Sequence, residues 1–317
     1  MSLAAFAQFV EVQTKLASII PFALGSLYAL YRYHSFRFDH FIIMFVSLIS
    51  FDMATTAINN YIDYTKARET EGYNFKQKNA IGRYGIKEST ARATIFTLLA
   101  VAVIFGIILT IKTSIVVLLV GALSFAVGIF YTFGPIPISR MPLGEAFSGL
   151  FMGFIIPFLA IYIHIYDQGI IAWSYQSGVV SFSINIVELA LIFLLSIPAV
   201  GGIANIMLAN NICDVDEDII NNRFTLPYYI GRKNAIRLFQ ALYYIGYIDL
   251  IILVALRIVP WTSLLVLLTL IPVGKNIHLF STRPIKGETF VLSVKNFAIM
   301  NLAQALVVAA MLVLGRP

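Results

Sequence analysis

The sequence predicts an all-α fold, a polytopic membrane protein with a bundle of about nine transmembrane helices. Of its 317 residues, 59% are hydrophobic and only 12% are charged, whereas an average soluble domain has roughly 25% charged residues. The apolar residues gather in runs of about 20, the length that a helix needs to cross a hydrocarbon core about 30 Å thick. Because no linker or shift in composition divides these runs, residues 1–317 are expected to form a single transmembrane domain.

We place one predicted helix on each long apolar run. In chain order the runs cover residues 16–33, 41–62, 93–111, 114–133, 143–165, 184–209, 235–256, 258–273 and 290–314. Most of the Lys and Arg residues lie in four of the loops, at 64–92, 134–142, 210–234 and 274–289. The positive-inside rule therefore predicts that these loops face the cytoplasm of a bacterial cytoplasmic membrane.

The charge and the cysteine content exclude several classes of protein. The formal net charge of +6 is explained by membrane orientation, so we expect the lipid bilayer as a partner and no nucleic acid. Cys213 is the one cysteine, which excludes an internal disulfide and a thiolate metal cluster. The first apolar run lacks a small-residue cleavage signature and is interpreted as a retained helix.

An Asn-Asn-x-x-Asp cluster occurs twice, each time near the downstream end of a long apolar run. The first cluster holds Asn59, Asn60 and Asp63, and the second holds Asn210, Asn211 and Asp214, with Asp218 four residues later. If each helix continues through its cluster, residues three and four apart share one face and their oxygens converge. Such hard oxygen ligands suit Mg²⁺, whose shell is completed by water and phosphate oxygens. Alternatively, these residues only cap the helix ends.

Cations follow both clusters and fit a metal-bridged diphosphate. They are Lys66, Lys76, Lys78 and Arg83 after the first cluster, and Arg223, Arg232 and Lys233 after the second. Arg can bind phosphate oxygens bidentately and Lys supplies a mobile charge, and Arg83 and Arg223 are the better candidates. The alternative for any single lysine is ordinary positive-inside charge. Glu69, six residues beyond Asp63, could add a carboxylate to the first cluster.

Two ionisable residues near or inside apolar runs are further candidates. Asp52 lies eleven residues before Asp63, about three helical turns, and so points to nearly the same face. An ionisable group at that depth is a functional candidate, although Thr55 or Thr56 could satisfy it. Lys15 could either snorkel to the membrane interface or reach the same anion as the clusters. Glu145, at the start of the fifth run, is interpreted as a helix cap.

A stretch rich in proline and glycine joins the fourth and fifth runs. It contains Gly134-Pro135-Ile136-Pro137, followed by Pro142-Leu143-Gly144-Glu145, and these residues predict a short rigid loop. No nucleophile elbow, P-loop or dinucleotide fingerprint accompanies it.

The two clusters resemble the paired aspartate-rich motifs of the UbiA-type intramembrane prenyltransferase superfamily, whose usual forms are Asn-Asp-x-x-Asp and a later Asp-x-x-x-Asp. The matching residues are Asn59, Asp63, Asp214 and Asp218, with Asn211 ahead of the second motif and Arg223-Phe224-Thr225-Leu226 similar to its Arg-Thr-Leu continuation. Asn60 stands where the family usually has Asp, and Glu69 stands where a further Asp is common. The first site is therefore expected to hold metal less tightly. Asn60→Asp is expected to retain activity and to lower the Mg²⁺ concentration needed for the half-maximal rate.

Within the superfamily, residues 54–59, the Gly-Pro-Ile-Pro loop and residues 142–145 are similar to the branch that prenylates 1,4-dihydroxy-2-naphthoate in menaquinone biosynthesis. The resemblance implies Mg²⁺-dependent transfer of a polyprenyl group from a polyprenyl (allylic) diphosphate to that aromatic acceptor. We predict three groups of site residues: catalytic Asp52, Asp63 and Asp214; diphosphate-binding Lys15, Lys66, Lys78, Arg83 and Arg223; and metal-binding Asn59, Asn60, Asp63, Glu69, Asn211, Asp214 and Asp218.

Two alternatives stay open at this point. The acceptor could be another molecule, such as 4-hydroxybenzoate or haem. A secondary transporter would also have many helices and basic cytoplasmic loops, but transporters tend to interrupt helices near the midplane, whereas the acid clusters here lie at helix ends.

Overall fold

The computed structural model describes residues 1–66, 79–134 and 137–314, and of Lys66 only the backbone. Nine helices within these residues are long and apolar enough to cross a membrane, which confirms the predicted fold class. The chain divides into two compact units, one formed by Met1–Ile19 and Ile42–Thr132 and the other by Ile20–Phe41 and Phe133–Pro317. The expectation of a single domain stays a prediction.

The first unit contains three long helices and a short amino-terminal segment. Its elements are α1 (Leu3–Phe9), η1 (Val12–Lys15), the first turn of α2 (Leu16–Tyr33), most of α3 (Phe38–Lys66), α5 (Ala80–Tyr84), α6 (Glu88–Lys112) and α7 (Ile115–Thr132). Phe9 from α1 and Ile81 from α5 are buried in one apolar cluster with Ala57 of α3 and Ile95 of α6. The amino-terminal segment is therefore packed onto the part of α3 that carries the first Asn-Asn-x-x-Asp cluster.

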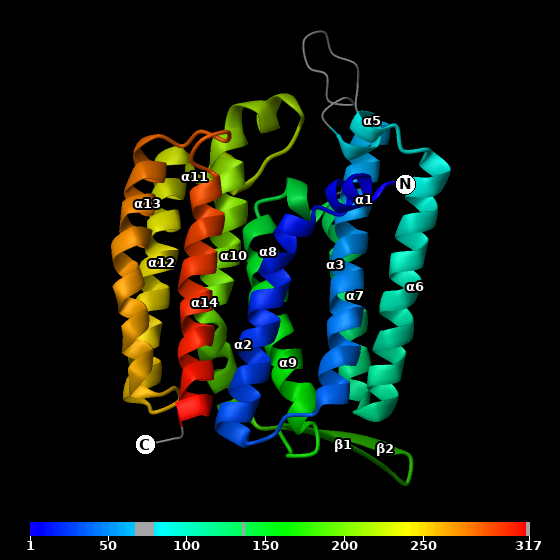
Figure 1. Ribbon diagram of the computed structural model, residues 1–317, viewed down its shortest axis with the longest axis vertical. Coiled ribbons are helices and arrows are strands. Elements are labelled where there is room, and N and C mark those ends of the chain that lie inside the picture. Colours follow the sequence, from blue (N-terminus) through cyan, green and yellow to red (C-terminus); the bar gives the residue numbers. More distant parts are fainter. Residues whose placement is uncertain (67–78, 135–136, 315–317) are drawn as a thin grey trace. The chain divides into compact units, whose positions relative to one another are not determined.

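The second unit is built around α10, the longest helix (Figure 1). It contains the rest of α2, η2 (Ile138–Arg140), α8 (Gly144–Leu150), η3 (Phe151–Ile155), α9 (Ile156–Ile165), β1 (Ile171–Gln176), β2 (Val179–Ile184), α10 (Ile186–Ile220), α11 (Leu226–Ile230), α12 (Arg232–Ala255), η4 (Trp261–Thr269), α13 (Leu270–Thr282) and α14 (Val291–Leu314). Helices α8, α12 and α14 all contact α10.

A Gly-x-x-x-Gly sequence lets α8 and η3 approach α10 closely. A Cβ atom built on Gly153 would lie 2.5 Å from the Cα of Val200, and one on Gly149 would lie 2.9 Å from the carbonyl oxygen of Val200. No side chain fits in these positions, as is typical of close helix pairs in membranes. Gly153 lies inside the single π-turn of η3, and such turns are frequent near functional sites.

Two of the predicted helix ends were wrong by more than two turns. Helix α10 continues to Ile220 and not only to residue 209, and the eighth span reaches Thr282 and not residue 273. In both cases the sequence becomes polar where we ended the span, but the backbone hydrogen bonds continue for about three further turns. Hydropathy marks where a helix leaves the apolar core and does not mark where it stops.

The loop after α9 contains a β-hairpin that we did not predict. β1 and β2 pair antiparallel, and Ser177 and Gly178 connect them with φ angles of 49° and 82°, the positive values of a two-residue type I′ turn. Trp173 lies opposite Phe182, so the two aromatic residues share one face of the hairpin. Alternation of residue types and the Ser-Gly pair were the available sequence signals.

A polar cluster ties the α2–α3 connection to the end of α9. Arg37 lies 2.5 Å from Asp167, and its backbone N–H donates to His164 Nδ1 at 3.0 Å. Partial burial lowers the pKa of Arg37, but the hydrogen bonds and charge interactions with Asp167 and Tyr166 together outweigh burial, so the pKa lies above its ordinary value. The cluster holds the connection in place and does not include any predicted site residue.

Candidate functional site

The first cluster lies inside a continuous helix. Helix α3 runs without a break through Asn59, Asn60 and Asp63 and ends at Lys66, so the i, i+3 and i, i+4 spacings place these side chains on one face. Asp63 is exposed, whereas Asn59 and Asn60 are half-buried. The geometric condition for a shared oxygen site is therefore met within this helix.

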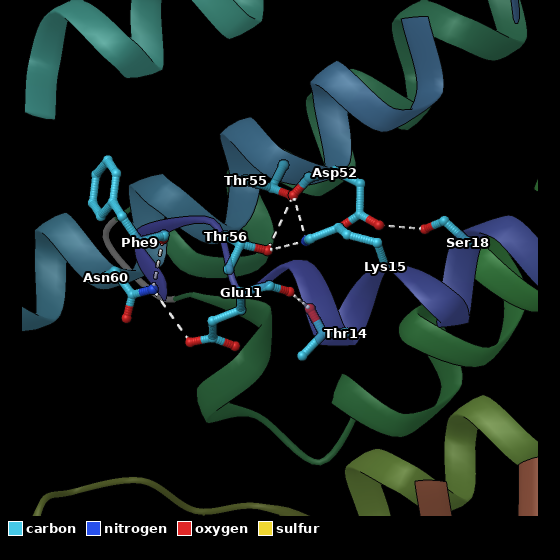
Figure 2. A network of polar contacts seen from close by, with 9 residues as sticks. All are labelled: Phe9, Glu11, Thr14, Lys15, Ser18, Asp52, Thr55, Thr56 and Asn60. Carbon is cyan, nitrogen blue, oxygen red and sulfur yellow. Dashed lines mark hydrogen bonds and ion pairs between the residues drawn. The ribbon is translucent and has the colours of Figure 1, made fainter. Parts of the chain in front are cut away.

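The side-chain amide of Asn60 is oriented by the amino-terminal segment. Its Nδ2 donates to the carbonyl oxygen of Phe9 at 3.0 Å and to Oε1 of Glu11 at 3.2 Å (Figure 2). Reversing the amide would place Oδ1 against two acceptors, so these contacts determine which atom is the oxygen. Asn60 Oδ1 therefore points away from Glu11 and is the one oxygen of this side chain that can bind a metal.

The buried Lys15 forms an ion pair with the partly buried Asp52 in the same network. The ammonium of Lys15 lies 2.6 Å from Asp52 Oδ1 and donates to Thr56 Oγ1 at 2.7 Å, and Ser18 donates to the other carboxylate oxygen at 2.5 Å (Figure 2). Lys15 is only 3% exposed, so it does not snorkel. Thr55 and Thr56 donate to the backbone carbonyl of Asp52, and the hydrogen bonds to its carboxylate come from Lys15 and Ser18, so the alternative that the two threonines satisfy this carboxylate does not hold.

For the other residues predicted around the first cluster, the structure gives fewer contacts. Arg83 is exposed on α5, and its guanidinium lies 5.8 Å from the ring centroid of Tyr84. Asn79, just before α5, donates to the backbone carbonyl of Asn60 at 2.8 Å and so links α5 to the cluster. Glu69, Lys76, Lys78 and the side chain of Lys66 lie outside the described residues. Their roles stay predictions.

The second cluster also lies inside a helix. Asn211, Asp214 and Asp218 are spaced i, i+3 and i+7 along α10, which continues to Ile220 and has Asn221 as its C-cap residue. The three side chains therefore share one face. Because Asn221 occupies the cap position, the acids of this cluster do not cap the helix.

Both acids of the second cluster are paired with cations. Asp214 contacts the ammonium of Lys286, and Asp218 lies 3.3 Å from the Nε of Arg223. Asp218 is 4% exposed, while the side chain of Lys286 is 53% exposed. Arg223 was a predicted anion-binding residue, but Lys286 was missed because it lies 72 residues away in the loop before α14 and no local pattern connects the two.

Asn211 connects the second cluster to α8. Its Nδ2 donates to Glu145 Oε1 at 2.8 Å, and both residues are buried, at 0% and 5% exposure. Our interpretation of Glu145 as a helix cap was therefore wrong, because its side chain reaches across to α10. The Gly-x-x-x-Gly contact between the two helices explains how a short side-chain pair can span them.

The loop that joins the fourth and fifth spans borders a cleft of about 400 Å³. The lining residues are Pro137, Arg140, Met141, Pro142, Asn222, Phe224 and Tyr229. The N–H of Phe224 donates to the carbonyl oxygen of Arg140 at 3.2 Å, so this loop is attached to the segment that follows the second cluster. Pro135 and Ile136 lie outside the described residues.

The donor atoms fit a hard cation such as Mg²⁺. Among the described residues, no three His, Cys, Asp or Glu side chains are close enough to form a metal cage by themselves. Mg²⁺ takes few carboxylates and completes its shell with water and substrate phosphates. The buried Oδ1 of Asn211 has no partner among the described residues, and the ammonium of Lys286 already contacts Asp214 where a cation would bind.

These observations define a class: helical membrane proteins that carry two oxygen-rich motifs on long helices. The family model for the UbiA prenyltransferase family matches residues 18–303, and the chain belongs to this family. It is therefore an integral membrane protein and a prenyltransferase, as the resemblance predicted. The 1,4-dihydroxy-2-naphthoate octaprenyltransferase of Bacillus subtilis (strain 168) is 29% identical over 241 residues, which cover 76% of this chain and 70% of that protein.

Solved structures share the fold at lower identity. A digeranylgeranylglyceryl phosphate synthase structure has a TM-score of 0.65 at 14% identity and covers 97% of this chain and 99% of that one. A UbiA homolog from Aeropyrum pernix K1 has a TM-score of 0.64 at 18% identity, with 95% and 98% coverage. One from Archaeoglobus fulgidus, bound to GPP and Mg²⁺, has a TM-score of 0.65 at 15% identity, with 98% and 99% coverage.

Proposed function

We propose that this prenyltransferase transfers a polyprenyl group from an allylic diphosphate to 1,4-dihydroxy-2-naphthoate, in menaquinone biosynthesis. The relative from Bacillus subtilis supports this acceptor. The observation that carries the transfer itself is the second cluster, where Asp214 and Asp218 share one helix face and each already pairs with a cation. An ion-pairing face of this kind suits a metal-bound diphosphate.

Two sets of side chains are assigned to the diphosphate: the ligands of the metal and the cations that bind phosphate oxygens. We assign metal binding to two groups: Asn59, Asn60 and Asp63 on α3 with Glu69, and Asn211, Asp214 and Asp218 on α10. Bound Mg²⁺ would neutralise the diphosphate and make it a better leaving group, and the Archaeoglobus fulgidus homolog bound to GPP and Mg²⁺ is consistent with this cofactor. Arg223, Arg83, Lys66 and Lys78 are assigned to phosphate oxygens.

In the transfer, a ring carbon of the acceptor forms a bond to C1 of the prenyl chain while the bond from C1 to the diphosphate oxygen breaks. The same ring carbon then releases either its carboxylate, as carbon dioxide, or its proton, and the bonding electron pair that stays in the ring restores aromaticity. Apolar side chains of the spans bury the prenyl tail and exclude water, which would otherwise capture the allylic cation. The bias of Lys and Arg toward four of the loops supports a reaction at the cytoplasmic side of a bacterial membrane.

The test uses purified full-length protein with farnesyl diphosphate and one acceptor at a time. We expect a prenylated product from 1,4-dihydroxy-2-naphthoate when Mg²⁺ is present, measured by mass spectrometry, and no product after chelation. Product from 4-hydroxybenzoate or haem alone would assign a different acceptor. Undiminished product in the presence of excess chelator would refute the metal-bound diphosphate.

A further inference from the structure

Glu145 is a buried carboxylate with one unused oxygen. Its Oε1 accepts the hydrogen bond from Asn211, but Oε2 is buried and has no hydrogen-bond partner among the described residues. The residue as a whole is 5% exposed. A buried carboxylate oxygen without a donor is costly. The oxygen therefore indicates a missing hydrogen-bond donor or cation.

The position of Glu145 is fixed by its surroundings. Gly149 and Gly153 hold α8 and η3 against α10 at backbone contact distance, and Asn211 Nδ2 orients the carboxylate from the other helix. Because the amide nitrogen of Asn211 faces Glu145, its oxygen is directed elsewhere and remains available to the metal that we assign to Asp214. Asn211 thus contacts Glu145 with its amide nitrogen and leaves its amide oxygen for the metal.

The position of Asn211 and Glu145 relative to the end of α10 indicates which part of the substrates they contact. Asn211 precedes Asp214 by three residues, so it lies about 4.5 Å further along the helix axis from the end of α10 that carries the acids. Metal and phosphate oxygens belong with Asp214 and Asp218. The acceptor ring must approach within about 3–3.5 Å of the prenyl C1 atom, and it therefore belongs beside the phosphates on the apolar side. Glu145 lies on that side.

We propose that Glu145 is the acceptor-binding residue, and that a ring hydroxyl of the aromatic acceptor donates a hydrogen bond to Glu145 Oε2. This inference rests on the proposed function. A carboxylate accepts from a hydroxyl with a charge-assisted hydrogen bond, about twice as strong as a neutral one. A site built around such an acceptor rejects ring compounds that lack the hydroxyl, because the buried oxygen would stay unpaired.

The experiment measures ligand binding to the full-length protein in nanodiscs, without diphosphate and with Mg²⁺. The two probes are 1,4-dihydroxy-2-naphthoate, kept reduced under anaerobic conditions, and 2-naphthoate, which lacks both hydroxyls. The wild-type protein should bind the dihydroxy compound roughly 10- to 100-fold more tightly. Glu145→Gln keeps an acceptor for Asn211 but turns an amide N–H toward the ligand, and it should reduce this preference to about threefold or less.

Glu217→Gln is the matched control, since it removes one carboxylate from the exposed side of α10 and should preserve the wild-type preference. Thermal unfolding checks that Glu145→Gln folds. If this variant does not fold, Glu145→Asp replaces it; Glu145→Asp keeps the charge and should retain part of the preference. A wild-type preference in the folded variant would overturn the proposal. So would an unchanged preference with a raised Mg²⁺ requirement for transfer, which would place Glu145 in the metal shell. If the wild-type protein neither binds nor prenylates the dihydroxy compound, the proposed acceptor itself is wrong.

Discussion

Replacing Asn60 by Asp gives the first motif the carboxylate that the family usually has there, and the sequence alone predicts tighter metal binding as a result. The structure changes this expectation. The Nδ2 atom of Asn60 donates to the carbonyl oxygen of Phe9 at 3.0 Å and to the carboxylate of Glu11 at 3.2 Å. An Asp at this position would turn an oxygen toward both acceptors, so the two donors would be lost and two carboxylates would face each other.

The magnitude follows from the contacts that change. A neutral hydrogen bond contributes about 1 kcal/mol and one to a charged group about 1.5–3 kcal/mol, so the loss is about 2.5–4 kcal/mol. Repulsion between carboxylates at this separation adds about 1 kcal/mol in water-like surroundings and more where water is excluded. Glu11 has a left-handed backbone with φ 49°, and this strain of about 1–2 kcal/mol would be released if the segment detached.

We therefore expect Asn60→Asp to loosen α1 and η1 from α3 and to raise the Mg²⁺ concentration needed for half-maximal transfer. Hydrogen exchange of residues 3–15, followed by mass spectrometry, measures the first effect, and a Mg²⁺ titration of transfer measures the second. The double variant Glu11→Gln with Asn60→Asp should recover much of the protection, because the amide of Gln can donate to the new carboxylate. Glu11→Gln alone is the control and should have a mild effect on exchange, since the Oε1 atom of Gln can still accept the hydrogen bond from Asn60.

Wild-type exchange rates in Asn60→Asp together with a lowered Mg²⁺ requirement would refute this reasoning. The contacts of Asn60 with the amino-terminal segment would then carry little free energy, and the expectation from sequence alone would be right. A double variant no better protected than Asn60→Asp would instead show that repulsion from Glu11 is not the cause.

The remaining predictions concern the two motifs and the ion pair of Lys15 and Asp52. Asp63→Asn and Asp214→Asn should each abolish transfer but leave the thermal unfolding midpoint near that of the wild type, because both remove metal-binding charge without touching the apolar packing; near-normal rates would contradict the metal assignment. Lys15→Met should lower stability by at most about 3–5 kcal/mol, since Asp52 is only partly exposed and keeps its charge without a cation, and adding Asp52→Asn should restore much of it in chemical denaturation. Lys286→Ala should tighten Mn²⁺ binding measured without diphosphate, because no ammonium has to be displaced from Asp214.

The spans were predictable because hydropathy is a sum over about 20 residues and tolerates local exceptions. The residues that contact the two motifs were not predictable from the sequence. Glu11 contacts Asn60 across 49 residues, and Lys286 contacts Asp214 across 72. Such contacts depend on how helices pack, and no periodicity within either segment encodes them. Glu145 shows the same limit, because its position at the start of a helix suggested a cap, whereas its partner Asn211 is 66 residues away.

Motif spacing predicted which side chains share a helix face, but it did not show that cations already cover the acids. Asp214 and Asp218 lie one turn apart on α10 and would repel each other if unpaired. Lys286 and Arg223 remove that repulsion, but they would also compete with the metal ion that we propose for this cluster. Metal arriving alone must displace Lys286, whereas metal arriving with a diphosphate offers Lys286 a new anion. The ion pairs therefore favour joint binding of metal and diphosphate, and by linkage each ligand should increase the affinity for the other by the same factor.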